Sequence, residues 1–419
     1  MRFLLLNQCF YPDVVSTAQH LTDLASELSA RGHEVTVVTS DRGYDDPTKK
    51  FPRYESWKNI QIYRIPSLSL GKETKLRRVL NFGSFLAICA SRLLTLKRFD
   101  VVVALTSPPL ISFLASLFVS LKGGRFCFWV MDLNPDEAIA AGWLSEDSAT
   151  ARLLKRMLRY SLKRADQTIV LDRFMRDRVL AKGIDSSRVS IVPPWSHDEF
   201  VSYSSSGRKA FRSAHDLVDK YVVMYSGNHS PCHPLDTLLN AAFAMRTDPE
   251  VTFCFVGGGS EQHKVRDFAR RHNLRNILCL PYQPIEELAG SLSAADVHVV
   301  VMGEKFAGIV HPCKVYNIMS VGAPIMYIGP PESHIADLAT DLGPDQLFAS
   351  HHGDVDVVVR HIRKASRVAR ESNVSMPSVN AERFSKHVLL PQMTSLLEFD
   401  AANDSTVLNA VPHSSVKAQ

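Results

Sequence analysis

The 419-residue sequence lacks a Cys-x-x-Cys pair, an apolar run of membrane-spanning length and a G-x-G-x-x-G fingerprint. Its seven cysteines are scattered, which is typical of reduced thiols in the cytoplasm and argues against a disulfide framework. The longest apolar run, 108–121, falls short of the roughly 20 residues that cross a bilayer. The apolar stretch at the N-terminus ends at Asn7, too soon for a signal peptide, and predicts a first β-strand. We therefore expect a soluble or peripheral protein of the cytoplasm.

The net charge of +5 is unevenly distributed, with basic residues crowded in 72–98 and 151–166. The second segment places Leu154, Leu158 and Leu162 on one stripe among basic residues, a pattern typical of a helix on an anionic surface. An ordinary amphipathic helix packed on a sheet is the alternative. Two such segments in one half of the chain favour contact with the inner face of a membrane over binding to nucleic acid.

Apolar runs that fit β-strands alternate with helical stretches along the whole chain, with a break at Pro193-Pro194. Near-continuous apolar strands separated by helices are typical of parallel sheets covered on both faces. The sequence predicts two tandem Rossmann-like, doubly wound α/β domains that face each other across a cleft. The predicted boundaries are 1–195 for the first domain, 196–217 for a linker, 218–376 for the second domain, 377–400 for a helix that crosses back to the first domain, and 401–419 for a flexible tail.

In such sheets, ligands bind beyond the carboxyl ends of the strands, so functional residues are expected in the loops there. The first, FYPDVVSTAQHL, leads into a helix whose N-terminal amides could face an anion, with Ser16 as its expected N-cap. The second, FWVMDLNPDEA, crowds Asp132, Asn134, Asp136 and Glu137 at the end of an apolar strand. Carboxylates are costly to bury without partners, so this cluster is functional or solvated, or it caps the next helix.

Two loops in the second half carry candidate binding groups. SGNHSPCHP places Gly227, Asn228, His229 and His233 between a strand and a helix, where they favour a phosphate or sugar contact. The spacing of these histidines with Cys232 matches no standard zinc pattern, so no metal is expected. FVGGGSEQ, which contains Gly257, is a weak signal and fits a tight turn by default.

The most informative loop reads GEKFAGIVHPCKVYNIMSVGAP, in which Lys314 stands in the first turn of a helix that Pro312 opens. A lysine there runs against the helix dipole, and a bound anion would offset this cost. Amides together with an ammonium group form a diphosphate site. The alternative is an ordinary ion pair with a surface carboxylate such as Glu304.

These loops resemble those of family-four retaining glycosyltransferases with the GT-B architecture, over about residues 1–398. The likeness is greatest to enzymes of bacterial exopolysaccharide and O-antigen synthesis, including colanic-acid fucosyltransferases. It rests on the segments quoted above and on LDRFMRDRVLAKGIDSSRVSIVPPW. The resemblance implies transfer of a sugar from a nucleoside-diphosphate sugar bound by 218–376 to an acceptor bound by the membrane-facing 1–195. The acceptor is expected to be a polyprenyl-diphosphate-linked sugar, and no cofactor is implied.

Two departures from the family pattern affect the donor site. Where relatives have two glutamates eight positions apart, this chain has Ile309 and Asn317. Asn317 could still bond the ribose hydroxyls, and the Ile309 amide could still serve. Relatives often neutralise the diphosphate with Arg and Lys in the loop that here contains His233, so we expect Lys314 and the histidines to replace that charge.

The resemblance and the loops together give a set of predicted site residues. Asp132 would orient the acceptor hydroxyl or the donor sugar, and Lys314 would stabilise the departing diphosphate, so both are expected to be catalytic. The expected donor-binding residues are Gly227, Asn228, His229, His233, Gly257, Tyr282, Gly308, Ile309, Lys314 and Asn317. The expected acceptor-binding residues are Pro12, Ser16, Thr17 and Asn134.

Two other functions remain open at this point. A sugar-nucleotide epimerase of the same architecture would also place carboxylates at the cleft, but it would need no acceptor and would release no free UDP or GDP. A non-catalytic nucleotide-sugar-binding protein would bind a donor without turnover, and the absent glutamates leave this minor alternative open.

Overall fold

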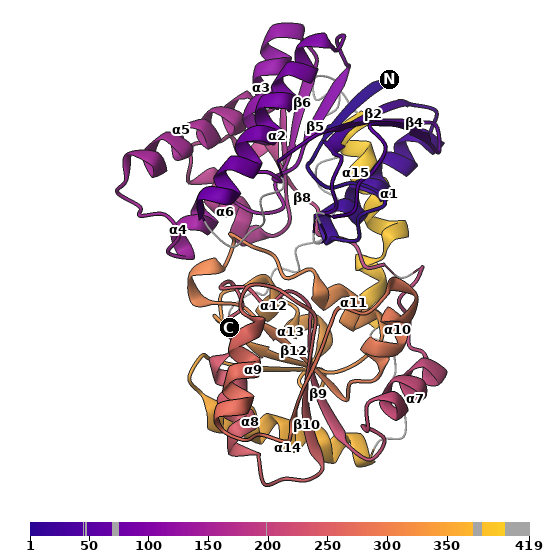
Figure 1. Ribbon diagram of the computed structural model, residues 1–419, viewed down its shortest axis with the longest axis vertical. Helices are drawn as coiled ribbons and strands as arrows, with labels where there is room; N and C mark the ends of the chain where they lie inside the picture. Colours follow the sequence, from indigo (N-terminus) through magenta and orange to yellow (C-terminus); the bar gives the residue numbers. More distant parts are fainter. Residues whose placement is uncertain (45, 47, 69–74, 198, 372–378, 399–419) are drawn as a thin grey trace, which may run out of the picture.

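The computed structural model describes residues 1–44, 46, 48–68, 75–197, 199–371 and 379–398. In this part of the chain two lobes face each other, and each has helices packed against a largely parallel sheet (Figure 1). The expected architecture of two doubly wound α/β domains is confirmed. The predicted tail, 401–419, lies outside the described residues.

The first lobe contains an eight-stranded sheet. Its strands are β1 (Arg2–Leu6), β2 (Glu34–Ser40), β3 (Tyr54–Trp57), β4 (Ile60–Ile65), β5 (Val101–Ala104), β6 (Arg125–Trp129), β7 (Gln167–Val170) and β8 (Val189–Ile191). They lie in the order β3-β4-β2-β1-β5-β6-β7-β8, and β3 alone among them pairs in antiparallel fashion. In the central strand, Leu5 is aligned with Val37 on one side and Val103 on the other. All three side chains are fully buried, as expected for strands covered on both faces.

The helices of the first lobe fill the connections between these strands. They are α1 (Ser16–Ala30), α2 (Lys75–Thr95), α3 (Ile111–Lys122), α4 (Asp136–Ala140), α5 (Ala149–Arg164) and α6 (Arg173–Leu180), with a 3₁₀ turn η1 (Ser186–Arg188). The predicted apolar stripe of α1 is buried, but the N-cap of this helix is Val15 and not Ser16. Ser16 is the first helical residue, and its hydroxyl lies 3.4 Å from Nδ1 of His20 one turn later.

Two of the three leucines in the stripe predicted to face a membrane are part of the core, and the third, Leu154, is half-buried. Leu158 and Leu162 on α5 are 5% and 0% exposed. They belong to the apolar cluster of the first lobe because α5 packs on α3 and β6. The alternative interpretation of this stripe is therefore the right one, and any membrane-facing apolar surface must use other residues.

The second lobe contains a six-stranded sheet in the order β11-β10-β9-β12-β13-β14. Its strands, which are parallel, are β9 (Tyr221–Ser226), β10 (Val251–Val256), β11 (Ile277–Leu280), β12 (Val297–Val301), β13 (Ile325–Ile328) and β14 (Leu347–Ser350). Its helices are α7 (Ser205–Ala214), α8 (Asp236–Ala244), α9 (Gln262–Arg271), α10 (Ile285–Ser293), α11 (Lys314–Ser320), α12 (His334–Asp337), α13 (Ala339–Leu342) and α14 (Val355–Glu371), with a 3₁₀ turn η2 (Glu304–Phe306).

Part of the predicted linker is a helix of the second lobe. α7 lies within 196–217 and packs on α10, where Gly207 and Gly290 approach so closely that a Cβ on Gly207 would come within 2.6 Å of the Gly290 Cα. The chain therefore joins the second lobe soon after residue 204, earlier than its composition indicated.

The last described helix, α15 (Lys386–Glu398), follows a 3₁₀ turn η3 (Val379–Phe384) and lies beside α1 of the first lobe (Figure 1). Glu398 accepts a hydrogen bond from Arg31 at 2.9 Å, and the Arg125 guanidinium donates to the Leu396 carbonyl at 2.8 Å. Met393 and Leu397 are fully buried in the core of the first lobe. The two lobes are thus linked both at 195–204 and by this returning helix.

Candidate active site between the lobes

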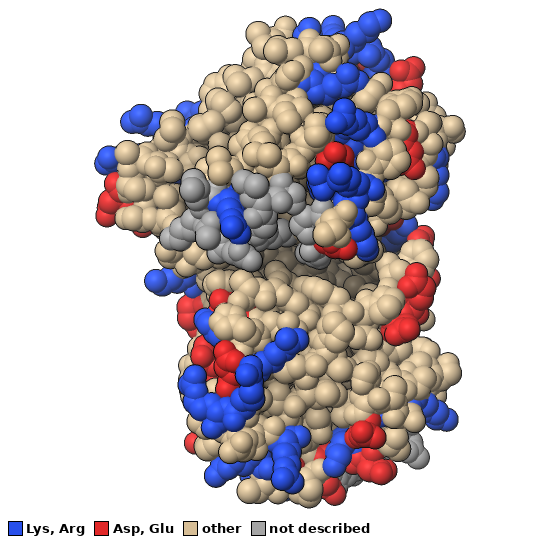
Figure 2. All heavy atoms as spheres, viewed as in Figure 1, with Lys and Arg blue, Asp and Glu red and all other residues tan. Residues whose placement is uncertain are grey.

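The loops at the carboxyl ends of the two sheets meet across a cleft. The Leu133 amide, after β6, donates to the Ile309 carbonyl, after β12, at 2.9 Å. Arg178 on α6 donates to the Ala307 carbonyl at 2.7 Å. Figure 2 shows a hollow between the lobes. The structure is therefore a closed arrangement, in which loops from both sheets line the same cleft.

Lys314, the first residue of α11, points its amine into the second lobe's part of this space. Its Nζ lies 3.8 Å from the centroid of the Tyr225 ring and is buried. No hydrogen-bond or ion-pair partner for this amine exists within the described residues, so the alternative pairing with Glu304 is absent there. Burial lowers the pKa of Lys314 to about 7. A buried amine without an anionic partner is costly to charge, and an anionic ligand such as a diphosphate would offset that cost.

Glycines form the wall against which this amine rests. Gly227 has a φ of 137°, and a Cβ at this position would lie 2.7 Å from Lys314 Nζ. A Cβ on Gly257 would meet the Gly227 carbonyl at 2.2 Å. The half-exposed Tyr282 ring lies against Gly257 and Gly258 at the mouth of the loop. The structure thus brings Gly227, Gly257, Tyr282 and Lys314 together, all predicted donor residues.

The two predicted histidines lie beside Lys314, but they are held as neutral side chains. Burial and then the Lys314 charge lower the pKa of His233 to about 3; for His229, burial is the main cause of a pKa of about 4. His229 Nδ1 lies 3.2 Å from the Gly258 carbonyl, and His233 Nδ1 lies 2.7 Å from the Val301 carbonyl. Each ring therefore donates to the backbone and presents an acceptor nitrogen. This corrects the expectation that these histidines supply positive charge in the free protein. Asn228, next to them, is exposed at the rim.

The two positions that replace the family's glutamates are engaged in contacts between the lobes. Ile309 is 3% exposed and its amide donates to the Phe306 carbonyl at 2.9 Å. Contrary to expectation, this amide is therefore not free to bind a ligand. Asn317 accepts a hydrogen bond from the His197 amide at 3.0 Å through its side-chain oxygen. Gly308 packs so tightly that a Cβ would lie 2.6 Å from the Phe174 backbone on α6. These three predicted donor residues hold the closed arrangement.

Asp132 and Glu137 form a carboxyl pair on the first lobe's side of the cleft. Burial, and then the Glu137 charge, raises the pKa of Asp132 to about 8. Glu137 accepts from the Asn134 amide nitrogen at 3.1 Å and contacts Cys232 Sγ of the other lobe at 3.7 Å. Two close carboxyl groups in a partly buried site share protons, so the pair titrates as a unit.

Ser16 and Asp132 converge on the start of α11. Burial raises the pKa of the Cys313 thiol to about 12, with the Asp132 charge adding to the shift and a hydrogen bond with Ser16 opposing it. Cys313 is the N-cap residue of α11, directly before Lys314. Of the other predicted acceptor residues, Thr17 follows Ser16 on α1 and the exposed Pro12 lies in the loop before it.

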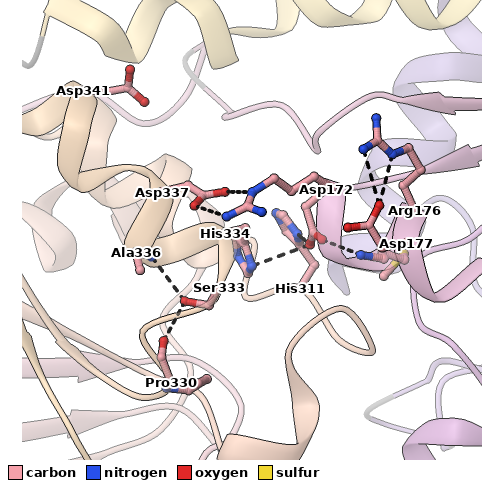
Figure 3. A network of polar contacts seen from close by, with 12 residues as sticks. Asp172, Arg176, Asp177, His311, Pro330, Ser333, His334, Ala336, Asp337 and Asp341 are labelled. Carbon is pink, nitrogen blue, oxygen red and sulfur yellow. Dashed lines mark hydrogen bonds and ion pairs between the residues drawn. The ribbon is translucent and has the colours of Figure 1, made fainter. Parts of the chain in front are cut away.

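Sequence reasoning missed two features near this space. The charge of Arg266 on α9 contributes to the low pKa of His229, so this guanidinium is a second cation near the donor loops. The sequence signal that could have indicated Arg266 is its position on α9, the helix that follows the loop with Gly257. The other is a buried cluster of Asp172, His311 and His334, gathered from both lobes (Figure 3).

The cluster has the residue types of a metal site but not its geometry. The His311 and His334 rings are stacked, with centroids 3.6 Å apart and planes 16° from parallel. A metal ion must lie in the plane of each imidazole that binds it, and two nearly parallel planes do not meet at one ion. Hydrogen bonds account for this contact better: Asp172 Oδ2 lies 2.7 Å from His311 Nδ1.

The close contact between Gly227 and Lys314 leads to a first prediction. Gly227→Ala is expected to displace the amine from the Tyr225 ring and to weaken nucleoside-diphosphate binding by about tenfold, measured by calorimetry. Gly32→Ala is the matched control, because Gly32 also has a positive φ, of 83°, but has open space around it. Both variants should lose stability through backbone strain, of about 1 kcal/mol. Equal nucleotide affinity in the two variants would contradict the assigned role of Gly227.

Comparisons with known proteins agree with the two-lobed fold. Residues 17–195 match the model of the glycosyl transferase 4-like domain. The chain is 24% identical over 387 residues to the putative colanic acid biosynthesis glycosyl transferase WcaI of Escherichia coli K12, which covers 90% of this chain and 94% of that protein. Sucrose-phosphate synthase from Thermosynechococcus elongatus is similar in structure, with a TM-score of 0.72 and 15% identity over 94% of this chain and 98% of that one. HepE from Anabaena, solved with UDP and glucose, gives a TM-score of 0.71 and 15% identity over 95% and 99%.

Proposed function

On the premise that residues 17–195 are a glycosyl transferase 4-like domain in a GT-B glycosyltransferase, we propose that the protein transfers a sugar from a nucleoside-diphosphate sugar with retention of configuration. The observation that carries this proposal is the buried Lys314 amine, seated against Gly227 without an anionic partner among the described residues. HepE, a structural neighbour, binds UDP and glucose, which supports the same class of donor here.

In the proposed reaction, negative charge grows on the diphosphate as the sugar–phosphate bond breaks. Lys314 and the backbone amides at the start of α11 stabilise that charge more in the transition state than in the ground state. The new bond forms on the face that the diphosphate leaves, and the departing phosphate takes the acceptor proton. This assigns the charge neutralisation to protein groups, so the proposal includes no metal or other cofactor.

We propose that Asp132 acts on the acceptor side of this reaction. It stands on the first lobe, yet its charge reaches Cys313, the residue before Lys314. We assign it the role of orienting the acceptor hydroxyl toward the sugar. The Glu137 charge acts on this carboxyl group by raising its pKa, and Asn134 donates a hydrogen bond to Glu137.

The proposed function is tested by donor binding followed by transfer. A donor that binds only the folded protein raises its melting temperature, so a panel of UDP-, GDP-, ADP- and dTDP-sugars identifies the base and sugar. The selected donor is then mixed with a polyprenyl-diphosphate-linked sugar, and release of the free nucleoside diphosphate is measured. Transfer with retained anomeric configuration supports the proposal. Conversion of the donor sugar without nucleotide release would instead identify an epimerase.

A lipid-linked acceptor requires a surface that can rest on a membrane. Within the described residues, no helix is both long and apolar enough to span one. Exposed leucines occur on three helices of the first lobe: Leu94 on α2 is 66% exposed, Leu121 on α3 is 72% exposed and Leu153 on α5 is 57% exposed. α3 packs against both α2 and α5, and Figure 2 shows an uncharged area over α2 and α3 bordered by Lys and Arg. We propose that this surface contacts the inner membrane face.

The membrane proposal predicts a loss of liposome binding when exposed charges are removed. Lys155 pairs with Glu146 at 2.8 Å and Arg159 donates to the Lys182 carbonyl at 3.0 Å, so Arg152 and Arg156 are the better targets. Arg152→Gln with Arg156→Gln should weaken binding to anionic liposomes by about 30-fold, since each basic residue near such a surface contributes about 1 kcal/mol.

The control carries the same charge change on the second lobe. Arg270→Gln with Arg271→Gln, on α9, should leave liposome binding unchanged. Added salt should weaken binding of the parent protein, because exposed charges are screened. The membrane proposal fails if both double variants bind anionic liposomes as the parent protein does at every salt concentration.

A further inference from the structure

One short helix of the first lobe holds the loop that leads to Lys314. This loop, 302–313, joins β12 to α11 in the second lobe. Arg178 on α6 donates to the Ala307 carbonyl at 2.7 Å, and the α6 backbone at Phe174 lies directly against Gly308. The third contact is between Asp172, at the start of α6, and His311. The three contacts fix the loop at successive points just before Lys314.

Asp172 has two separate roles that use its two oxygens. As the N-cap of α6 it accepts from the Met175 amide at 2.7 Å through Oδ1. Its Oδ2 lies 2.7 Å from His311 Nδ1, and His311 Nε2 lies 2.7 Å from the Tyr316 hydroxyl on α11. The contact therefore runs from α6 of the first lobe through His311 to α11, the helix that begins with Lys314.

The contact is buried, and it favours the ionised form of Asp172. Asp172 is 6% exposed and His311 is 7% exposed. Burial favours the neutral form of Asp172, but the hydrogen bond and charge of His311 outweigh it and lower the pKa of Asp172 to about 2. His334 covers the pair from the second lobe, and Figure 3 shows both imidazoles beside the Asp172 carboxylate. If the lobes separated, Asp172 would lose its hydrogen bond with His311.

We propose that Asp172 is a positioning residue that couples closure of the two lobes to the donor site, by holding His311 so that Lys314 is seated for the diphosphate. This inference rests on the proposed function of Lys314. Asp172 touches neither donor nor acceptor. It acts through His311. The nucleotide then binds tightly only to the closed form, and its apparent affinity falls in proportion when that form is less populated.

The test is Asp172→Asn, which keeps an oxygen for the Met175 amide but removes the charge that faces His311. UDP, GDP, ADP and dTDP affinities are measured by calorimetry, and amide hydrogen exchange is measured across 303–314 without nucleotide. The affinity of the nucleotide that binds should fall by about tenfold, the size expected for a lost charge-assisted contact. Exchange in 303–314 should become faster, whereas exchange in the β9 loop, 227–233, should change little.

The matched control is Asp185→Asn. Asp185 also accepts from a backbone amide, that of Ser187 at 2.9 Å, but it caps the exposed turn η1. A purely structural role for Asp172 would lower the melting temperature of its variant while leaving nucleotide affinity and loop exchange equal to those of the Asp185 variant. That result would overturn the proposal.

A double variant identifies the partner through which Asp172 acts. If Asp172 works through His311, then Asp172→Asn combined with His311→Gln should bind nucleotide about as weakly as either single variant, because both remove one interaction. Fully additive losses would show that the residues act separately and would contradict the coupling. If the parent protein bound none of these four nucleotides, the proposed function would fail, while the exchange measurement would still decide whether Asp172 controls the loop.

Discussion

Lys314→Ala is expected to weaken nucleoside-diphosphate binding by about tenfold or more while leaving the fold intact. Charge-assisted hydrogen bonds contribute about 1.5–3 kcal/mol, and this amine has no other anionic partner among the described residues. Lys314→Gln should restore little affinity, because the amide keeps hydrogen bonding without the charge. Turnover should fall as well, because the same charge stabilises the departing diphosphate. Calorimetry and steady-state kinetics measure the two effects.

The protonation of Lys314 provides a second readout for the same variant. With a pKa of about 7 in the free protein, instead of the ordinary 10.5, the amine is largely neutral at pH 8. A bound diphosphate favours the charged form, so binding at pH 8 should take up a proton, and affinity should fall as pH rises above about 7. Calorimetry in buffers of different ionisation enthalpy detects this proton, and Lys314→Ala should abolish it.

Lys305→Ala is the matched control for both readouts. Lys305 is an exposed lysine of η2, in the loop that leads to α11. Its replacement should change neither the affinity nor the proton uptake. If Lys314→Ala bound nucleotide as tightly as this control, the donor-site assignment of the whole 302–314 segment would have to be abandoned.

Asp132→Asn should reduce turnover by at least about tenfold, or about 1.4 kcal/mol in barrier, with little change in donor affinity. The variant keeps the size of the side chain and cannot become a carboxylate. Because the pKa of Asp132 is raised to about 8, turnover of the parent protein should rise with pH through this region as the carboxylate forms. This rise should be absent in the variant. Initial rates at saturating donor from pH 6 to 9 measure both effects.

Asp136→Asn serves as the control for the Asp132 experiment. Asp136 stands in the same acidic loop, but it pairs with Lys182 at 2.7 Å, away from Glu137. Its variant should keep both the rate and the pH dependence of the parent protein. A fully active Asp132→Asn protein would refute the assignment of Asp132 as catalytic.

The fold was largely predictable because its strands are buried on both faces and appear as apolar runs. The strands that escaped prediction lie at sheet edges. β3 is the short, polar segment YESW, and the turn after it uses Lys58 and Asn59 at φ of 48° and 60°, which no apolar pattern marks. β14 is four residues long and follows two short helices.

The candidate site was less predictable, because its properties depend on contacts between distant segments. Pro312 indicates that Lys314 stands in a first helical turn. The surroundings of its amine, however, are formed by Tyr225 and Gly227, which are distant in the sequence. The neutral state of His229 follows from burial, which residue type does not reveal. Asp172 gave no signal at all, since an aspartate before a helix is an ordinary N-cap.

The position of α15 has a consequence for how the chain is made. Residues 1–195 leave the ribosome first, yet the face of α1 against which α15 packs has no cover until residue 398 has been synthesised. Met393 and Leu397, fully buried in the first lobe, come from the last helix of the described chain. Until then the nascent first lobe exposes an apolar surface, which is a typical origin of aggregation in multidomain chains. The first lobe, although it is made first, is therefore the part of the chain that we expect to depend on a chaperone during synthesis.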